Sequence, residues 1–296
     1  MTLFLLLLAA VAGGLNPAVV KYLANQFSPF TFITLRFVLA VLVLLPIAYK
    51  RKWIKWKNFN KEMLITNILF AGNTIIFTLG IKYTSVIVSQ VVYLMTPLLV
   101  AVIGFLIIKE KLTKIQFIGL IISLAGTGFI LESSFKSPDL LSNGTLLGNL
   151  LMAAADLCWA IYLVMSKKIG KSYTPLQIIF NSFAVTALIA IVISPFLFDP
   201  TKIIGDINLL SASALIFAVL VSSIGFFFLY QVLLTKTSVF TTSLLSYLTV
   251  GTTTLFGALF YKEHLTPNII FGCLLVSFGV IFAATYKHAY SFIKNK

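Results

Sequence analysis

The sequence predicts an all-α membrane protein whose ten transmembrane helices form two inverted five-helix repeats around a central cavity. Three observations support this fold class: a very apolar composition, ten long apolar runs, and the duplication of one segment. Of the 296 residues, 59% are hydrophobic and only 10% are charged, whereas water-soluble domains have about 25% charged residues. This chain cannot cover itself with polar groups, so we expect lipid to surround it.

Ten apolar runs account for most of the chain. A helix needs about 20 apolar residues to cross a bilayer, and with no water in the bilayer core each run has to satisfy its own backbone hydrogen bonds. We therefore expect ten transmembrane helices, the first of them retained because it lacks the charged start of a secretory signal. Their expected positions are residues 2–24, 30–49, 63–82, 86–108, 114–132, 145–167, 174–197, 210–231, 238–261 and 266–286.

One segment of the chain occurs twice. Residues 84–126 return as residues 237–279 at a constant shift of 153 positions, without a gap across two apolar runs and the turn between them. The earlier runs correspond more weakly, with Lys21 matching Lys167 at a shift of 146 positions. A repeat of this kind indicates that the structure is duplicated as well.

Each copy contains five expected helices, and this odd number has a topological consequence. The second copy has to enter the membrane from the opposite face, so a pseudo-two-fold axis in the membrane plane relates the two. We expect residues 1–135 and 136–296 to be the two repeats of one integrated transmembrane domain. Inverted repeats are typical of secondary transporters, in which the site between the halves opens to each side in turn.

The basic residues orient the helices. Sixteen of the 22 Lys and Arg residues lie on the side that holds both chain ends, five lie on the other side, and Arg36 lies inside an apolar run. By the positive-inside rule, we expect a protein integral to the cytoplasmic (inner) membrane with both termini in the cytoplasm. Because the lysines lie between apolar runs and not on a soluble face, the net charge of +14 does not indicate nucleic-acid binding.

The turn and the glycines of the duplicated segment have a structural interpretation. Thr113 followed by Gln116 matches a capping box, which would begin the fifth helix. Gly119 and Gly126 are seven residues apart on one helical stripe, the second copy repeats this pair, and such small residues let membrane helices pack closely. We interpret helices five and ten as packing elements and the turn as a helix terminus, with a direct substrate role of the turn as the alternative.

Several short motifs follow one another in a fixed order. They are Ser28-Pro29, Leu35-Arg36, Thr84-Ser85-Val86, Lys109-Glu110-x-Leu112-Thr113 with Gly119, Trp159, and Lys262-Glu263-x-Leu265-Thr266 with Gly272. In this order and spacing, the chain resembles the drug/metabolite transporter superfamily, in particular members with two EamA-type repeats. It departs from them at Gly13, where relatives often carry tryptophan, and at Asp156, an acid that is not expected in helix six. The resemblance implies a basket of helices one to four and six to nine around a central cavity, with helices five and ten outside, and export of amino acids or small metabolites.

Two charged residues lie inside apolar runs. A charged side chain at the centre of a transmembrane helix costs about 2.5–3.5 kcal/mol on insertion scales, so each needs a reason to be there. Asp156 lies near the midplane of helix six. Our hypothesis is that it lines the cavity, where it would accept a substrate ammonium or carry a proton; a structural role is the alternative. For Arg36 there are two hypotheses: a structural role, in which it pairs with carbonyls or snorkels outward, and direct contact with the substrate.

Polar and aromatic residues near the midplane complete the candidate cavity. Tyr93 and Ser246 are repeat-related, as are Thr96 and Thr249, so both pairs should face the shared axis. An aromatic-lined cavity with few polar groups suits small, partly apolar solutes, although each residue could instead make an interhelical hydrogen bond. The candidate set is Asn16, Asn73, Gln90, Tyr93, Thr96, Asp156, Trp159, Tyr162, Ser246 and Thr249.

The fourth expected helix contains a proline. Pro97 has no backbone N–H, which predicts a helix kink at the depth of the cavity. Its counterpart in the second copy is Val250, so we expect this kink to break the symmetry between the repeats.

Enzymatic chemistry is poorly supported by the sequence. It has no His, Cys or carboxylate cluster with metal-ligand spacing and no Gly-rich phosphate loop. We therefore expect no catalytic residue, no metal and no cofactor, and a gradient in place of ATP as the driving force. The expected partners are a small-molecule metabolite, the lipid bilayer, and a proton or another coupling ion.

The sequence predicts a secondary transporter that exports small metabolites, amino acids or related compounds, by alternating access. One alternative is an importer or exchanger of phosphorylated or sugar-linked metabolites, but such dianions require several basic residues in the cavity and only Arg36 is a candidate. The other is a non-transport membrane scaffold or a lipid-modifying enzyme, which has no need of a midplane polar cluster on repeat-related faces.

Overall fold

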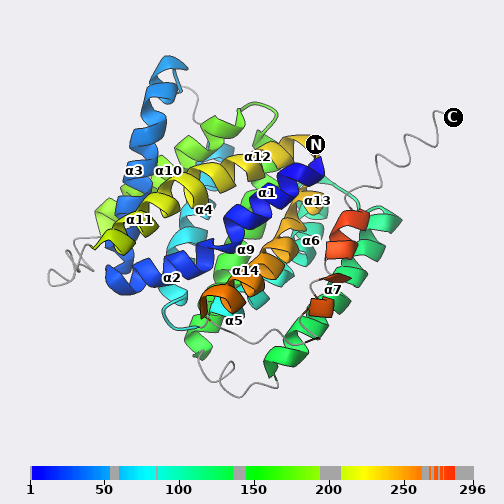
Figure 1. Ribbon diagram of the computed structural model, residues 1–296. Coiled ribbons are helices and arrows are strands. Elements are labelled where there is room, and N and C mark those ends of the chain that lie inside the picture. The colour runs from blue at the N-terminus through cyan, green and yellow to red at the C-terminus, as the bar shows by residue number, and fades with distance from the viewer. Residues whose placement is uncertain are drawn as a thin grey trace.

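The computed structural model shows a bundle of helices (Figure 1). Every regular element within the described residues is a helix, which confirms the predicted fold class. The described residues are 2–53, 60–84, 86–135, 145–193 and 208–261, together with 267, 270–272, 274–275 and 277–283.

The first five predicted helices lie close to their expected positions. Two of them are divided by a short irregularity, helix one after Gly14 and helix four around the 3-10 turn η2. Their elements are α1 (Thr2–Gly14), α2 (Asn16–Gln26), α3 (Pro29–Lys50), α4 (Lys61–Gly80), α5 (Val86–Val92), η2 (Tyr93–Met95), α6 (Thr96–Ile108) and α7 (Lys114–Phe135).

The second five follow the same order. Helix eight contains a π-helical segment, η5, and helix nine is divided at Leu244. The elements are α9 (Leu146–Ile169), α10 (Pro175–Ile193), α11 (Leu209–Phe217), η5 (Ala218–Gly225), α12 (Phe226–Lys236), α13 (Val239–Ser243) and α14 (Leu245–Tyr261). Helix ten is described in parts between residues 270 and 283, and the second copy of the turn, 262–266, lies outside the described residues.

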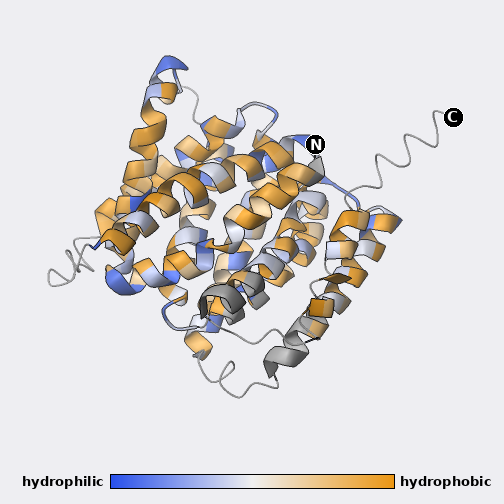
Figure 2. Cartoon of the chain, viewed as in Figure 1, coloured by the Kyte–Doolittle hydropathy of each residue, from blue (hydrophilic) through white to orange (hydrophobic). Residues whose placement is uncertain are grey.

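The length and composition of the helices suit a membrane. Six described helical stretches are each long and apolar enough to cross a bilayer, and three further apolar helices are shorter. The bundle presents apolar residues on its outside (Figure 2), where Leu42, Leu106, Val192 and Leu209 are all exposed. A soluble monomer rarely exposes such extensive apolar surface, whereas this surface is suited to contact with lipid.

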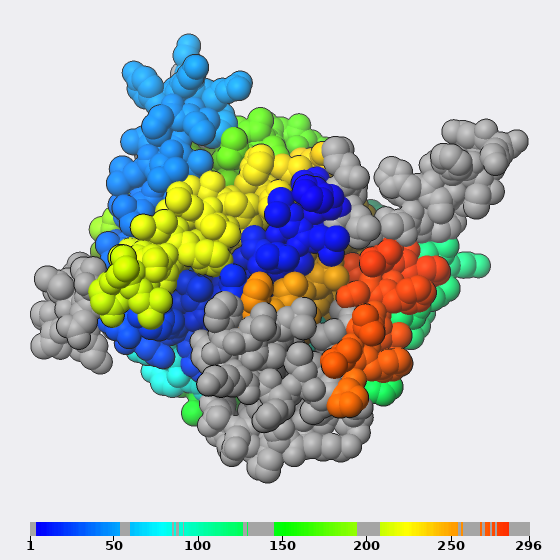
Figure 3. Space-filling view, in the orientation of Figure 1, coloured from blue at the N-terminus to red at the C-terminus, as the bar shows by residue number. Residues whose placement is uncertain are grey.

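The helix packing is nearly the same when each helix is exchanged for the one five places later. The contact of α4 with α9 has its counterpart in the contacts of α12 and η5 with α1, and the contact of α6 with α9 has its counterpart in that of α14 with α1. Figures 1 and 3 show α1 lying between α12 and α14. This exchange pattern is the one expected for two inverted repeats.

One side-chain contact also occurs twice. Lys21 Nζ donates to the backbone oxygen of Thr84 at 2.8 Å. Its repeat partner, Lys167, donates to the backbone oxygen of Thr237 at 2.6 Å, and also to that of Leu234. Since Thr84 and Thr237 are themselves repeat-related, the weak sequence correspondence between the lysines is structurally real.

Helix α7 and helix ten lie side by side at one edge of the bundle (Figure 1). A Cβ atom added to Gly119 would lie 2.6 Å from the Ala283 Cβ and 2.7 Å from the backbone oxygen of Gly279. Only glycine permits so close an approach, which confirms the predicted packing role of these two helices.

The turn between α6 and α7 ends one helix and supports another. Lys109 closes α6 in the left-handed conformation, with φ 56°. The predicted capping box is confirmed, because the Thr113 backbone N–H donates to Gln116 Oε1 and the Gln116 backbone N–H donates to Thr113 Oγ1. The Glu110 carboxylate accepts from the backbone N–H groups at the start of α13, at 3.2 and 3.3 Å. The turn therefore connects the two repeats.

Helices four and nine are both interrupted, so the expected loss of symmetry at Pro97 is wrong. Pro97 lies in the first turn of α6, directly after η2. The second copy has no proline there, yet it breaks between α13 and α14. The repeat-related Thr96 and Thr249 form equivalent bonds near these interruptions, from Thr96 Oγ1 to the Tyr93 backbone oxygen at 2.7 Å and from Thr249 Oγ1 to the Ser246 backbone oxygen at 2.8 Å. Such bonds from Ser or Thr often bend helices.

Candidate functional site

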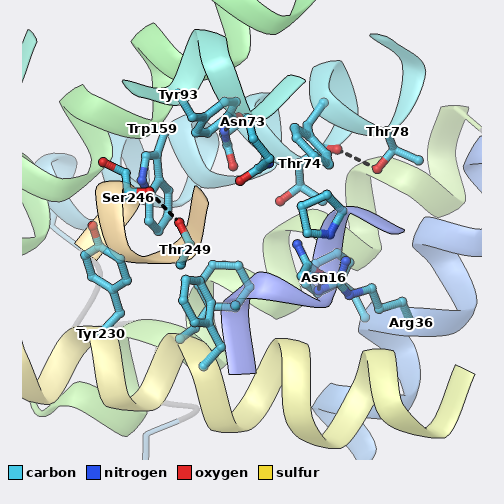
Figure 4. A pocket seen from close by; sticks show the side chains of 17 residues that line it. Asn16, Arg36, Asn73, Thr74, Thr78, Tyr93, Trp159, Tyr230, Ser246 and Thr249 are labelled. Carbon is cyan, nitrogen blue, oxygen red and sulfur yellow. Dashed lines mark hydrogen bonds between the residues drawn. The ribbon is translucent and has the colours of Figure 1, made fainter. Parts of the chain in front are cut away.

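A cavity of about 90 Å³ lies inside the bundle, between elements of both repeats (Figure 4). A water molecule needs at least about 10–15 Å³ by a comparable measure, so the space can hold several waters or a small solute. Its lining residues are Gly13, Asn16, Pro17, Arg36, Phe37, Asn73, Thr74, Phe77, Thr78, Gln90, Tyr93, Trp159, Phe226, Phe227, Tyr230, Ser246 and Thr249.

The wall comes from most of the helices that the basket arrangement implies. α7 and the described part of helix ten contribute no lining residue, as expected for packing elements. α10 contributes none either among the described residues, and it packs instead behind α3 and α4. The cavity is therefore enclosed by helices one to four, six, eight and nine, and helix seven supports two of them.

Seven of the ten predicted cavity residues line this space. They are Asn16, Asn73, Gln90, Tyr93, Trp159, Ser246 and Thr249. The other three, Thr96, Asp156 and Tyr162, lie behind the wall, which corrects the expectation that they face the cavity. The reason is rotational: three residues along a helix leave two side chains about 60° apart, and on α9 it is Trp159 that faces inward.

Asp156 is buried against the interruption of helix four. It is 1% exposed, and its Oδ1 lies 2.5 Å from the hydroxyl of Thr96. Its Oδ2 has no hydrogen-bond partner among the described residues. A substrate ammonium in the cavity would thus meet Trp159 and not this carboxyl.

Tyr162 belongs to a polar network on the far side of Trp159. Its hydroxyl accepts from Gln231 Nε2 at 2.7 Å, and the same amide nitrogen lies 3.1 Å from the Ser166 hydroxyl. Its ring stacks on Trp159 with a centroid separation of 5.2 Å. Tyr162 therefore supports the inward-facing tryptophan from behind.

Arg36 lies in the cavity wall although it is only 3% exposed. Its Nε donates to the Ser223 hydroxyl at 2.7 Å, and its Nη2 donates to Asn16 Oδ1 at 3.1 Å. The rings of Phe32 and Phe37 lie 5.9 and 5.3 Å from the guanidinium carbon. Arg36 therefore does not snorkel outward: its partners among the described residues are side chains inside the bundle, and one of them is the amide carbonyl of Asn16.

The π-helical segment η5 supplies one of these partners. Ser223 accepts from Arg36 and donates its own hydroxyl hydrogen to the Ala218 backbone oxygen at 2.8 Å. A π-helical turn widens the helix and occurs frequently at functional sites. Here it places a hydroxyl oriented by the backbone beside the buried guanidinium.

The uncharged polar residues of the wall divide into two groups. Asn73 uses both amide hydrogens, one to the Tyr93 hydroxyl at 2.6 Å and one to the Ala155 backbone oxygen at 2.9 Å. Ser246 and Thr249 donate to backbone oxygens of their own helix. Gln90, in contrast, forms no hydrogen bond within the described part of the chain, so its amide is available to a solute.

The aromatic wall is wider than the sequence analysis predicted. Helix α12 adds three aromatic residues to the cavity wall, Phe226, Phe227 and Tyr230. The Tyr230 ring packs edge to face against the Trp159 ring, with 5.1 Å between the ring centroids. A signal for these three residues exists in the duplication, since a shift of 153 relates them to Asn73, Thr74 and Phe77 of α4. Gly13 and Trp159 are likewise related, at a shift of 146.

The chemistry of the wall is that of binding. Arg36 is the one ionised side chain among its described members, and no carboxylate, histidine or cysteine joins it. Within the described residues, no group of three His, Cys, Asp or Glu side chains could hold a metal ion. The wall thus offers one cation, a free amide and several aromatic faces.

Comparison with known proteins agrees with this architecture. A model of the EamA-like transporter family matches residues 1–132 and 146–285. A solved crystal structure of a protein that is 17% identical covers 98% of both chains with a TM-score of 0.76, which supports the fold.

Three curated relatives come from two bacteria and one archaeon. The uncharacterized transporter YyaM of Bacillus subtilis strain 168 is 29% identical over 188 residues, and the match spans 62% of this chain and 61% of YyaM. An uncharacterized transporter of Archaeoglobus fulgidus is 27% identical over 271 residues, which cover 90% and 92% of the two chains. The uncharacterized inner membrane transporter YhbE of Escherichia coli K12 is 26% identical over 184 residues, which cover 60% of this chain and 57% of YhbE.

Proposed function

Because this chain belongs to the EamA-like transporter family, we propose that it is a secondary transporter that exports small metabolites, such as amino acids or related compounds, by alternating access. Membership makes it an integral membrane transporter and not an enzyme. Direction and substrate are the proposal. The observation that carries it is a buried cavity between two inverted repeats, with a wall that includes repeat-related positions.

The two repeats are the moving parts of this proposal. Residues 1–135 and 136–296 rock against each other, and the cavity between them is exposed to one side at a time. The lysine distribution supports a cytoplasmic location for both termini. The name of YhbE as an inner membrane transporter supports a location in the cytoplasmic membrane.

A proton is the coupling ion that the geometry favours, with Asp156 as its carrier. A hydroxyl has a single hydrogen, yet Thr96 Oγ1 lies 2.7 Å from the Tyr93 backbone oxygen and 2.5 Å from Asp156 Oδ1. If the hydrogen lies toward Tyr93, the short contact with Asp156 needs a proton on the carboxyl. If Asp156 is ionised, the hydroxyl turns toward it and the Tyr93 oxygen loses this bond.

Protonation of Asp156 therefore acts on the 3-10 turn that carries Tyr93 into the cavity wall. The tyrosines that interact electrostatically with the carboxyl are Tyr93 on η2 and Tyr230 on α12. No cation of the described chain forms an ion pair with Asp156. Loading and release of one proton are thereby linked to the shape of helix four.

Flux measurement tests the transport proposal. The purified protein is reconstituted into proteoliposomes, and uptake and release of radiolabelled amino acids are compared with liposomes without protein. We expect saturable flux of at least one amino acid, accelerated by an imposed proton gradient. A protein that moves sugar phosphates in exchange but no amino acid would be an exchanger, and one that moves no solute of any class would be a scaffold; either result rejects the proposal.

A further inference from the structure

We infer that Arg36 binds one carboxylate group of the solute, so that the cavity selects organic monoanions and zwitterions over amines and multiply charged phosphates. This inference extends the proposed function by naming the chemical class of the solute. It rests on the proposed function in one respect, namely that the cavity is the substrate site. It depends on the free donors of Arg36, on the absence of an acidic partner among the described side chains, and on the aromatic wall.

The Arg36 guanidinium has donors to spare. A guanidinium has five N–H groups, of which Nε–H is donated to Ser223 and one N–H of Nη2 to Asn16. Both N–H groups of Nη1 lack a partner among the described residues. Two parallel N–H groups of this kind match the two oxygens of a carboxylate.

The charge of Arg36 is not balanced by the protein residues that surround it. Burial of a cation in a low-dielectric interior is costly unless an opposite charge and hydrogen bonds compensate it. Ser223 and Asn16 are neutral, and the three acids whose side chains are described are engaged elsewhere: Glu62 pairs with Lys168, Glu110 caps α13, and Asp156 contacts Thr96. An anion in the cavity would supply the missing charge.

The number of cations sets the charge of that anion. Phosphate groups carry close to two negative charges at neutral pH, and in the described wall only Arg36 could neutralise them. A carboxylate has a single charge and suits a single guanidinium. A solute whose only charged group is an amine would instead be repelled by Arg36, and the described wall offers it no carboxylate.

The remainder of the wall suits an apolar body. Trp159, Tyr230 and Phe227 line the same cavity as Arg36. The free amide of Gln90 and the aromatic faces can receive the ammonium of an amino acid, since cations are attracted to ring faces. Aliphatic or aromatic monocarboxylates and amino acids are therefore the expected ligands.

The binding experiment compares solutes of one shape and different charge. The full chain in lipid nanodiscs is heated with isocaproate, its amide isocaproamide, isoamylamine, leucine or phosphoenolpyruvate, and the unfolding temperature is recorded. A ligand that binds the folded state raises this temperature. We expect isocaproate and leucine to raise it in a saturable manner, and the amide, the amine and phosphoenolpyruvate to leave it unchanged.

Three variants connect the response to Arg36. Arg36→Gln should weaken isocaproate binding by about 10- to 100-fold, as expected for lost charge-assisted hydrogen bonds. Asn16→Asp keeps the side-chain shape but places a carboxylate about 3.1 Å from Nη2, so it should abolish the isocaproate response while the ligand-free protein stays as stable as the wild type. Arg51→Gln, at the exposed end of α3, is the matched control and should respond like the wild type.

The results separate this inference from the transport proposal. The inference is overturned if no carboxylate stabilises the protein, if the amide or the amine stabilises it as well as isocaproate does, or if Asn16→Asp retains the full response. Flux of a neutral or cationic solute would leave transport intact and reject the role of Arg36. If carboxylates bind in a manner that depends on Arg36 but no solute is transported, the role of Arg36 is kept and the transport proposal is rejected.

Discussion

At the scale of single residues, the two intramembrane charges differ in what surrounds them. Among the described residues, the two N–H groups of Arg36 Nη1 in the cavity wall have no partner, and neither has one oxygen of Asp156 behind the wall. A buried polar group without a hydrogen-bond partner lowers the stability of the protein. We therefore expect a solute or an ion to supply the missing partner of each residue. We assign a solute anion to the first and a proton to the second.

The proton is tested by Asp156→Asn. An asparagine amide can donate to Thr96 at every pH and so imitates the protonated carboxyl. We expect an imposed proton gradient to accelerate wild-type flux in proteoliposomes several-fold and to leave the flux of the variant unchanged. Thr96→Val, which keeps the carboxyl but removes the hydroxyl, should also weaken the coupling. If Asp156→Asn keeps both the rate and the pH profile of the wild type, Asp156 has no part in the mechanism.

Gly13 makes a second prediction at this scale. A Cβ at this position would lie 2.6 Å from Phe226 Cε2 and 2.9 Å from Thr249 Cγ2. Overpacking of this kind costs about 1–3 kcal/mol, so Gly13→Ala should lower the free energy of unfolding by that amount in a detergent titration.

Gly72→Ala is the matched control for Gly13→Ala. Its nearest added contact is Cys158 Sγ at an ordinary 3.6 Å, and alanine favours a helix interior by roughly 1 kcal/mol over glycine. The control should therefore be neutral or stabilising. Equal losses for both variants would mean that the close approach of Phe226 to Gly13 is not present in the protein.

At the scale of elements, the ends of the helices connect the repeats. The turn between α6 and α7 caps α7 with Thr113 and Gln116, and its Glu110 accepts from the first N–H groups of α13. The first N–H groups of any helix have no partner within the helix. A residue of one repeat thus completes the start of a helix in the other.

Glu110→Ala should therefore destabilise the bundle although it removes no apolar contact. Loss of an N-terminal cap costs about 0.5–2 kcal/mol, to be measured as a fall in the free energy of unfolding. Glu62→Ala is the comparison, because the Glu62–Lys168 ion pair is partly exposed, with both side chains 41% accessible, and such pairs contribute at most about 1 kcal/mol. A smaller effect at Glu110 than at Glu62 would argue against the cross-repeat cap.

At the scale of the whole molecule, the repeat-related hydrogen bonds of Lys21 and Lys167 connect helices near the two ends of the bundle. Lys21 holds the start of helix four and Lys167 the start of helix nine, through the backbone oxygens of Thr84 and Thr237. Inverted symmetry places these contacts at opposite ends of the bundle. Alternating access requires that one end opens while the other is closed.

Lys21→Met and Lys167→Met should therefore shift the conformational equilibrium in opposite directions. Lys21→Met removes one charge-assisted hydrogen bond and Lys167→Met removes at least two. One such bond contributes about 1.5–3 kcal/mol, enough to change the ratio of the two states by a factor of about ten or more. The measurement is labelling of Thr78→Cys, a cavity position, from each side of proteoliposomes, with Cys158 and Cys273 replaced by alanine. Lys82→Met, exposed beyond the end of α4, should have no effect, and a shift in the same direction for both variants would contradict the symmetric arrangement.

The sequence determined the helices and the duplication, and it identified eight of the seventeen wall residues, Arg36 among them, because these depend on local composition and on the repeat itself. The duplication also relates three further wall residues to α4: Phe226, Phe227 and Tyr230 are the repeat counterparts of Asn73, Thr74 and Phe77. Only the tertiary structure decided which way Asp156 faces and which donors of Arg36 remain free. The physical reason is that a membrane helix is apolar toward lipid and toward its neighbours alike, so its rotation, and with it the direction of each polar side chain, is set by packing against the other helices.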